Sequence, residues 1–151
     1  MRKKRSTQAK AYLEGIRRIQ IQSRQQKRML KELRETAAAI SSPSFSADRV
    51  QSSGSGSGAK FEQKVESIVE IESDLKDSMQ QITEALNLLR RMDNPAYSEL
   101  LELRYIYNKS WKSVSKQMDE DGLYYSDRYV RFNMHTKALA DFEKILRSST
   151  K

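Results

Sequence analysis

Apolar side chains in the first 40 residues recur at alternating spacings of three and four, the pattern of a helix that packs along one stripe. The stripe consists of Ile16, Ile19, Leu30, Leu33, Ala37 and Ile40, with Ser23 and Gln26 as a polar break. Three consecutive alanines at 37–39 are strong helix formers. This pattern predicts a single helix over residues 1–40, with a mobile basic arm at residues 1–7 because that stretch has no apolar surface to bury.

A second helix is predicted over residues 59–92, where the same periodicity is clearest. Its stripe consists of Phe61, Val65, Ile68, Leu75, Met79, Ile82, Leu86 and Leu89, with Glu72 out of pattern. Pro43 and alternating Ser and Gly make residues 41–58 a flexible connector. Two such helices joined by a flexible link predict an antiparallel hairpin, and the same stripes equally allow pairing of two copies as a homodimer.

The chain from residue 96 to 151 differs in kind, since it holds six of the seven Tyr and the only Trp. Pro95 stops the preceding helix, and the pattern then predicts helices over 96–107, 110–118 and 126–146. Ser110 and Ser126 are expected N-caps. Two sets of apolar residues are expected in the core: Trp111, Val114 and Met118 on one helix, and Val130, Met134, Ala138 and Phe142 on the next. The predicted fold is therefore all-α, with a long coiled-coil-like helical hairpin followed by a three-helix lobe.

Composition excludes several classes of protein. Of 151 residues, 37% are hydrophobic and 32% charged, and only five are Gly and two Pro, too few for a turn-rich β-fold. There is no Cys and one His, which leaves no thiolate or histidine metal site and no catalytic triad. We therefore expect no enzyme, no metal, no cofactor and no small-molecule substrate. Without a long apolar run or a signal peptide, we expect no membrane association and a cytoplasmic location.

The positive charge is concentrated at the start of the chain. The net charge is +8, and residues 1–40 hold twelve Lys or Arg against three Asp or Glu, whereas residues 60–95 hold five against eight. A basic protein favours polyanionic partners because neutralising phosphates releases condensed counterions.

The segment SWKSVSKQM, a turn, and then a longer basic and aromatic helix outline a helix-turn-helix, whose second helix enters the DNA major groove. On that helix the candidates for contact with base edges are Arg128, Tyr129, Arg131, Phe132 and Asn133. The candidates for phosphate contact are Lys109, Lys112, Lys116, Ser126 and Lys137. His135 is expected at the surface or beside a phosphate.

The segments YSELLELRYIYNKSWKSVSKQM and YSDRYVRFNMHTKALADFEKIL resemble region 4 of bacterial sigma factors. Together with the connector at 48–54 and the long N-terminal helices, the chain resembles the sigma-region-4-like ArpU-type late transcriptional regulators of phages and prophages. In this chain Val130 and the triplet 137–139 lie one residue further apart than in that pattern. The resemblance implies an activator of phage late genes that binds double-stranded promoter DNA in the bacterial cytoplasm, with the host RNA polymerase as a partner and no catalysis.

Two alternatives remain open from the sequence. The chain could be a helical adaptor that binds polymerase or another protein without reading DNA sequence. It could also be a structural coiled coil whose basic arm binds nucleic acid without sequence preference.

Overall fold

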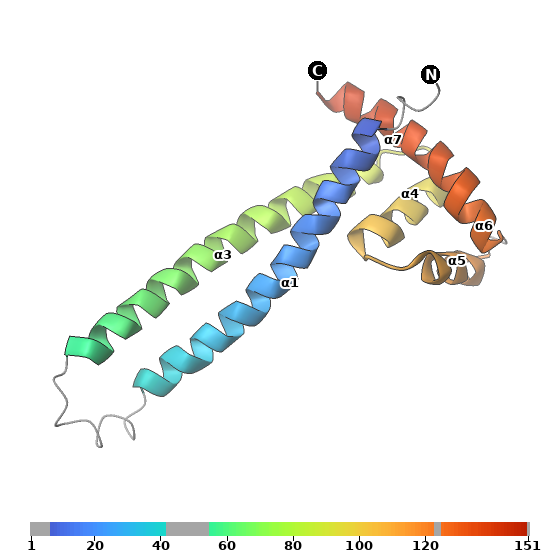
Figure 1. The fold of residues 1–151 in the computed structure, drawn as a ribbon. Coiled ribbons are helices and arrows are strands. Elements are labelled where there is room, and N and C mark those ends of the chain that lie inside the picture. The colour runs from blue at the N-terminus through green and yellow to red at the C-terminus, as the bar shows by residue number, and fades with distance from the viewer. Residues whose placement is uncertain (1–6, 42–54, 123–124, 151) are drawn as a thin grey trace. The chain divides into compact units, whose positions relative to one another are not determined.

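The computed structural model describes residues 7–41, 55–122 and 125–150, and every element in these ranges is a helix (Figure 1). The elements are α1 (Thr7–Ser41), α3 (Ser55–Leu89), α4 (Pro95–Leu101), α5 (Trp111–Glu120), α6 (Asp127–Tyr129) and α7 (His135–Ser149), with two wider π-helical turns, η2 (Glu102–Ile106) and η3 (Val130–Met134). The predicted all-α class, a helical hairpin followed by a helical lobe, is confirmed. The chain divides into two compact units, a hairpin unit over 21–79 and a lobe formed by the residues up to 20 and from 80 onward.

Several predicted boundaries change. The connector was predicted over residues 41–58, but residues 55–58 are already helical in α3, and α1 runs through Ser41. The second helix ends at Leu89 rather than at residue 92. The rest of the connector and most of the basic arm lie outside the described residues. The lobe also begins earlier than the predicted residue 96, because the end of α3 and the start of α1 contribute to its core.

In the hairpin unit, α1 and α3 run antiparallel (Figure 1), and Arg34 on α1 forms an ion pair with Glu72 on α3. The predicted stripe on α1 is confirmed: Leu30 and Ala37 are buried, and Leu33 and Ile40 are half-buried. The polar positions that interrupt the stripe also face inward, since Ser23 is only 6% exposed and Gln26 is half-buried. The basic first helix and the acidic second one therefore place opposite charges beside a shared apolar seam.

On α3 six of the eight predicted stripe positions are buried or half-buried, and Val65 and Met79 are not. Leu75 is buried, and Phe61 and Ile68 are half-buried, but Val65 is 40% exposed and Met79 is 58% exposed. The second inward column lies one residue earlier, at Lys64, Ile71 and Ser78. Phe61, Ile68 and Leu75 face inward in both arrangements. Apolar residues such as Val65 and Ile71 lie on either side of them, so apolar spacing alone does not identify which neighbouring column faces α1. Glu72, the one position that was out of pattern, lies at the same heptad position as Val65 and Met79, and its exposed carboxylate pairs with Arg34.

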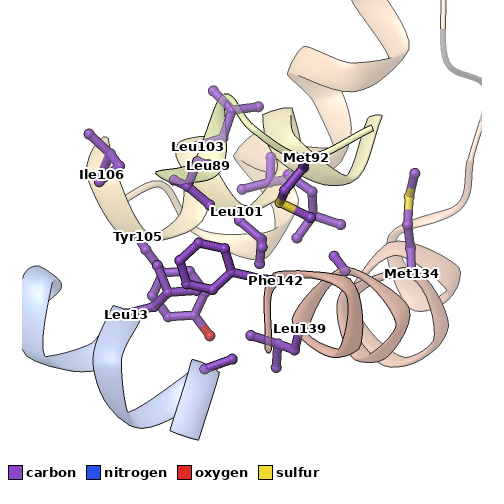
Figure 2. Close-up of a cluster of buried hydrophobic side chains, with 14 of the residues drawn as sticks. Leu13, Leu89, Met92, Leu101, Leu103, Tyr105, Ile106, Met134, Leu139 and Phe142 are labelled. Carbon is purple, nitrogen blue, oxygen red and sulfur yellow. The ribbon is translucent and has the colours of Figure 1, made fainter. Parts of the chain in front are cut away.

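One apolar cluster forms the core of the lobe and joins helices that are far apart in the sequence (Figure 2). Leu13 from α1, Leu89 from α3, Leu101 from α4 and Phe142 from α7 are each completely buried. Burying a side chain of this size stabilises a fold by about 1.5–3 kcal/mol, so the ends of the two long helices are part of the lobe's own core.

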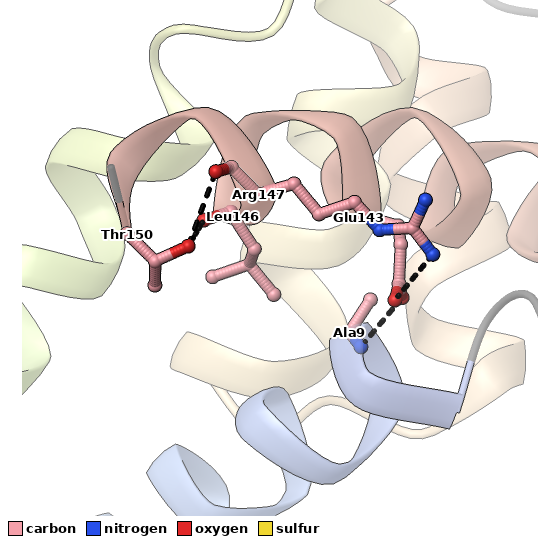
Figure 3. Close-up of polar contacts among 5 residues, drawn as sticks. All are labelled: Ala9, Glu143, Leu146, Arg147 and Thr150. Carbon is pink, nitrogen blue, oxygen red and sulfur yellow. Dashed lines mark hydrogen bonds and ion pairs between the residues drawn. The ribbon is translucent and has the colours of Figure 1, made fainter.

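A buried carboxylate ties α7 to the beginning of α1 (Figure 3). Glu143 is 4% exposed, and its Oε2 accepts a hydrogen bond of 2.9 Å from the main-chain N–H of Ala9, in the first turn of α1. Arg147, one turn further along α7, lies 3.7 Å from the other carboxylate oxygen. Main-chain N–H groups in the first turn of a helix have no partner within the helix, and the helix dipole favours a negative charge there.

Side-chain caps start α4, α5 and α6. The Ser110 hydroxyl accepts from the N–H of Ser113 and the Ser126 hydroxyl from the N–H of Tyr129, each at 3.2 Å, which confirms both predicted N-caps. Asn94 caps α4 in the same way. Left-handed backbone conformations end η2 and α5, at Asn108 (φ 55°) and Gly122 (φ 86°). Asn and Gly are the residues that tolerate this conformation best.

The helix that contains α6 and α7 includes one wide turn. The N–H of His135 donates to the carbonyl of Val130, five residues earlier, so η3 holds one residue more than an α-helical turn. This turn lies between Val130 and residues 137–139, the stretch in which one extra residue was expected. In an α-helix, residues four positions apart are rotated by about 40° around the helix axis. The wider turn offsets this rotation, and both Val130 and Met134 are buried.

Substituting Leu75→Ala should lower the free energy of unfolding by about 2–3 kcal/mol, because it leaves a cavity in the hairpin seam. Val65→Ala, one of the residues that turned out to be exposed, should change it by less than about 0.5 kcal/mol. Urea unfolding followed by circular dichroism measures both. Equal losses would place Val65 back in the seam.

Gly122→Ala should destabilise the lobe by about 1 kcal/mol, because an L side chain resists the left-handed conformation that ends α5. A Cβ at this site meets no atom within 4 Å, so backbone strain is the only cost. Gly15→Ala is the matched control: this glycine lies within α1, also with an open Cβ position, and alanine there should stabilise by up to about 1 kcal/mol. Thermal unfolding of the two variants should show shifts of opposite sign, and a shared sign would contradict the assignment.

Candidate nucleic-acid interface

The start of the last helix presents a surface hollow of about 570 Å³ lined by polar and aromatic side chains. Four of the five candidates for base contact line this hollow. The complete lining is Ser126, Arg128, Tyr129, Phe132 and Asn133. Arg128 and Asn133 are exposed, and Phe132 is 59% exposed. A hydrogen-bonding arginine and asparagine therefore lie beside an accessible aromatic ring at the N-terminal end of one helix.

The lobe holds this segment in place from beneath. Val130 and Met134 face the core, where they join Val114 and Met118 of α5 in one buried cluster, as predicted. Trp111 packs against the edge of that cluster. The helix that carries the hollow is therefore supported by the helix before it, which is the mechanical requirement of a helix-turn-helix.

The residues that lead into the segment are also anchored. The hydroxyl of Ser115 on α5 donates to the carbonyl of Tyr125 at 3.3 Å. The ring of Tyr125 stacks on that of Tyr129, with centroids 5.2 Å apart. Tyr129 is consequently half-buried and supports the hollow from one side more than it projects into it. Tyr124 lies outside the described residues.

Arg131, the remaining candidate for base contact, lines a different hollow of about 310 Å³. That hollow also contains Lys10 from α1 and Arg104 from η2. Phe132 borders both hollows and separates them. The structure thus brings Arg128, Tyr129, Phe132 and Asn133 together and turns Arg131 toward α1.

The candidates for phosphate contact occupy several positions. Lys112 and Lys116 are exposed, one turn apart on α5, and line a hollow of about 350 Å³ that also includes the carboxylates of Asp119 and Asp127. Lys137 is exposed on α7. Lys109 is half-buried, and its carbonyl accepts a 2.9 Å hydrogen bond from Arg104. The hydroxyl of the fifth candidate, Ser126, is engaged in its cap.

The sequence predicted His135 at the surface or beside a phosphate; the structure half-buries it in the lining of the second hollow. Its Nε2 shares a hydrogen bond of 2.8 Å with the hydroxyl of the buried Tyr105, and its ring meets Trp111 edge-on at 4.7 Å between centroids. Burial, together with the positive charges of Lys10 and Arg104, lowers the pKa of His135 to about 4. The imidazole is therefore neutral near pH 7 and acts as a structural side chain.

A carboxyl group on α4 has its pKa shifted the other way. Burial raises the pKa of Glu99 to about 7, helped by a hydrogen bond with Asp121 and by the negative charges of Asp121 and Glu102. Asp121 caps the end of α5, so this carboxyl pair joins α4 to the turn that follows α5.

Sequence reasoning missed the basic residues of the second hollow. Lys10 is one of twelve basic residues at the start of the chain, and nothing in its spacing separates it from the others. Arg104 lies in the Arg-Tyr pair that the resemblance included, but its stacking over Trp111, 4.7 Å from the ring centroid, depends on the fold.

Within the described ranges, no group of His, Asp and Glu side chains is arranged to hold a metal ion. Nor does any helix in the described part of the chain have the length and apolar character needed to cross a membrane.

Acidification should destabilise the lobe through His135. An unfolded histidine gains its proton near pH 6.5, whereas the folded one does so only near pH 4, so stability is lost as the pH falls through that window. The partial exposure of the ring reduces the effect to about 1–2 kcal/mol. Glu99 acts oppositely: the stability from its protonated form is present at low pH and is lost as the pH rises through about 7.

The measurement is urea unfolding between pH 4 and pH 7.5 in a Glu99→Gln background, which removes the opposing titration. Adding His135→Gln, which can keep a hydrogen bond to Tyr105, should flatten the pH dependence. Parallel curves with and without His135 would contradict the buried neutral histidine.

Comparison of the chain with protein-family models, with curated proteins and with solved structures finds no match.

Proposed function

We propose that this protein is a DNA-binding transcriptional regulator that reads promoter DNA with the segment from Ser126 to Asn133 and activates phage or prophage late genes in a bacterial host. The observation that carries the proposal is the hollow at the start of the last helix, where Arg128, Phe132 and Asn133 are exposed together on a braced helix. The phage context and the direction of regulation come from the sequence resemblance alone.

The side chains of this hollow suit direct reading of base pairs. Arginine can donate two hydrogen bonds to guanine, and asparagine can pair with adenine, through the major groove. Phe132 offers an apolar surface that can pack against a thymine methyl group. In this arrangement Arg128 and Asn133 would select bases, and the N-terminal end of the helix would lie deepest in the groove.

Exposed lysines on the neighbouring helix suit the phosphate backbone. Lys112 and Lys116 project from one side of α5, and contacts of this kind fix the orientation of a protein on DNA without reading sequence. The nearby carboxylates Asp119 and Asp127 restrict where a phosphate can approach, because they repel it.

The wide turn η3 coincides with the proposed reading segment. It includes Phe132 and Asn133, and such turns occur frequently at functional sites. An extra residue in the turn changes the direction in which the following side chains project. The proposed base contacts therefore belong to this chain's own register and differ from those of an uninterrupted α-helix.

Protein binding through the hairpin is a second candidate function, either with the host RNA polymerase or with a second copy of the chain. The observation that favours it is a set of exposed large apolar side chains in the hairpin unit, namely Ile21, Met29, Val65, Val69 and Met79. Val65 and Val69 lie one helical turn apart on α3, and adjoining exposed apolar side chains are typical of interaction sites. This role is compatible with DNA binding by the lobe.

Selection from a random pool of 30-base-pair duplexes at physiological salt tests the main proposal. The wild-type protein should enrich a defined sequence. Arg128→Ala and Asn133→Ala should each cost about 1–3 kcal/mol on that sequence and relax its preference at one position. Lys112→Ala and Lys116→Ala should weaken binding to all sequences alike.

Lys144→Ala is the matched control, because Lys144 is a highly exposed lysine on α7 outside the three hollows. It should leave both affinity and preference unchanged. Uniformly weak binding by the wild-type protein, without enrichment, would overturn the proposal and favour the protein-binding function.

A further inference from the structure

The second hollow, which Lys10, Arg104 and Arg131 line, has the features of a phosphate site. Its volume is about 310 Å³, and its lining is completed by Glu14, Tyr105, Trp111, Phe132, His135 and Thr136. Three helical segments that are far apart in the sequence each contribute one cation. A single carboxylate, Glu14, faces these three positive charges, and His135 is neutral near pH 7.

The three cations are not neutralised by ion pairs. Within the described part of the chain, none of Lys10, Arg104 and Arg131 lies within 4.0 Å of a carboxylate oxygen. Burial and the nearby charge of Arg17 lower the pKa of Arg104, and Arg131 adds to that effect. A cluster of positive charges without ion-pair partners favours an anionic ligand.

The fold gives both arginines of the site fixed neighbours before any ligand arrives. The guanidinium of Arg104 is fixed by stacking over Trp111 and by its hydrogen bond to the carbonyl of Lys109. The guanidinium of Arg131 lies 5.2 Å from the ring centroid of Phe132. Planar guanidinium groups bind phosphate through paired hydrogen bonds, so two pre-positioned arginines and a lysine suit a group with several anionic oxygens.

We infer that Lys10, Arg104 and Arg131 form a binding site for a phosphate group, contributed either by the DNA backbone or by a free phosphorylated molecule. The backbone is the source that the geometry favours, because Phe132 is shared between this site and the hollow that faces the bases. For that source the inference rests on the proposed function, whereas affinity for phosphate itself does not. Arg131 then contacts a phosphate rather than a base edge, and the beginning of α1 becomes part of the binding surface.

The only Trp of the chain lies in this site, so its fluorescence reports on occupancy. Inorganic phosphate is titrated into the full-length protein at constant ionic strength, with chloride as the replaced anion. A saturable change in Trp111 fluorescence is expected with phosphate and not with chloride. Identical responses to the two anions would overturn the inference.

Lys10→Gln and Arg104→Gln should each weaken phosphate binding about tenfold, because each removes a charged hydrogen-bond donor. Arg18→Gln removes the same charge from an exposed position on α1 outside the site and should change the affinity less than about twofold. Lys10 is exposed, so its variant should fold even if Arg104→Gln does not. An equal loss in Lys10→Gln and Arg18→Gln would mean general attraction by a basic surface and would overturn the site.

Duplex DNA distinguishes the two sources of phosphate. If the backbone occupies the site, Lys10→Gln should weaken binding to all sequences and reduce the slope of log affinity against log salt by about one. If the variant loses phosphate affinity but binds DNA as the wild type does, the site serves a free phosphorylated molecule. Phosphate binding by a protein that binds no DNA would support the site and refute the proposed function.

Discussion

The buried carboxylate of Glu143 needs hydrogen-bond donors, and it finds one at the first turn of α1. A buried charge without partners costs several kcal/mol, so α7 and the beginning of α1 stay together wherever the lobe is folded. Ala9, Leu13 and Ile16 then complete the core around Phe142. The beginning of the N-terminal helix is consequently a structural component of the lobe, although Ala9 and Glu143 lie 134 positions apart in the sequence.

This link has consequences for the candidate interface. It positions the face of α1 that carries Lys10 beside Arg104 and Arg131. Burial, together with the charges of Lys10 and Arg104, lowers the pKa of His135 and keeps the imidazole neutral near pH 7. The segment from Ser126 to Asn133 depends on other contacts of the same core, in which Val114 and Met118 support Val130 and Met134. The proposed base-reading hollow and phosphate site thus lie next to each other but rely on different parts of the core.

Much of the local structure could be predicted from single residues. Ser110 and Ser126 start helices because their hydroxyls satisfy N–H groups that the helix cannot. The alternation of apolar residues on α1 identified its buried stripe, including the polar position Ser23. On α3 the same reasoning chose Val65 rather than Lys64, because hydropathy favours valine and carries no information about the direction of the partner helix. The sequence indicated one extra residue between Val130 and residues 137–139. It did not indicate that a wide turn, η3, would accommodate this residue.

The sequence by itself determined the elements: helices, their caps, their apolar faces and the candidates for contact with DNA. These follow from interactions within a few residues, such as capping hydrogen bonds and helical periodicity, which neighbouring positions in the chain decide. Only the tertiary structure decided that Lys10 meets Arg104 and Arg131, that His135 is buried against Tyr105, and that Glu143 holds α1 to α7. Those contacts join residues between 30 and 134 positions apart. Their existence depends on how whole helices pack, since no local pattern distinguishes Lys10 or Glu143 from other charged residues.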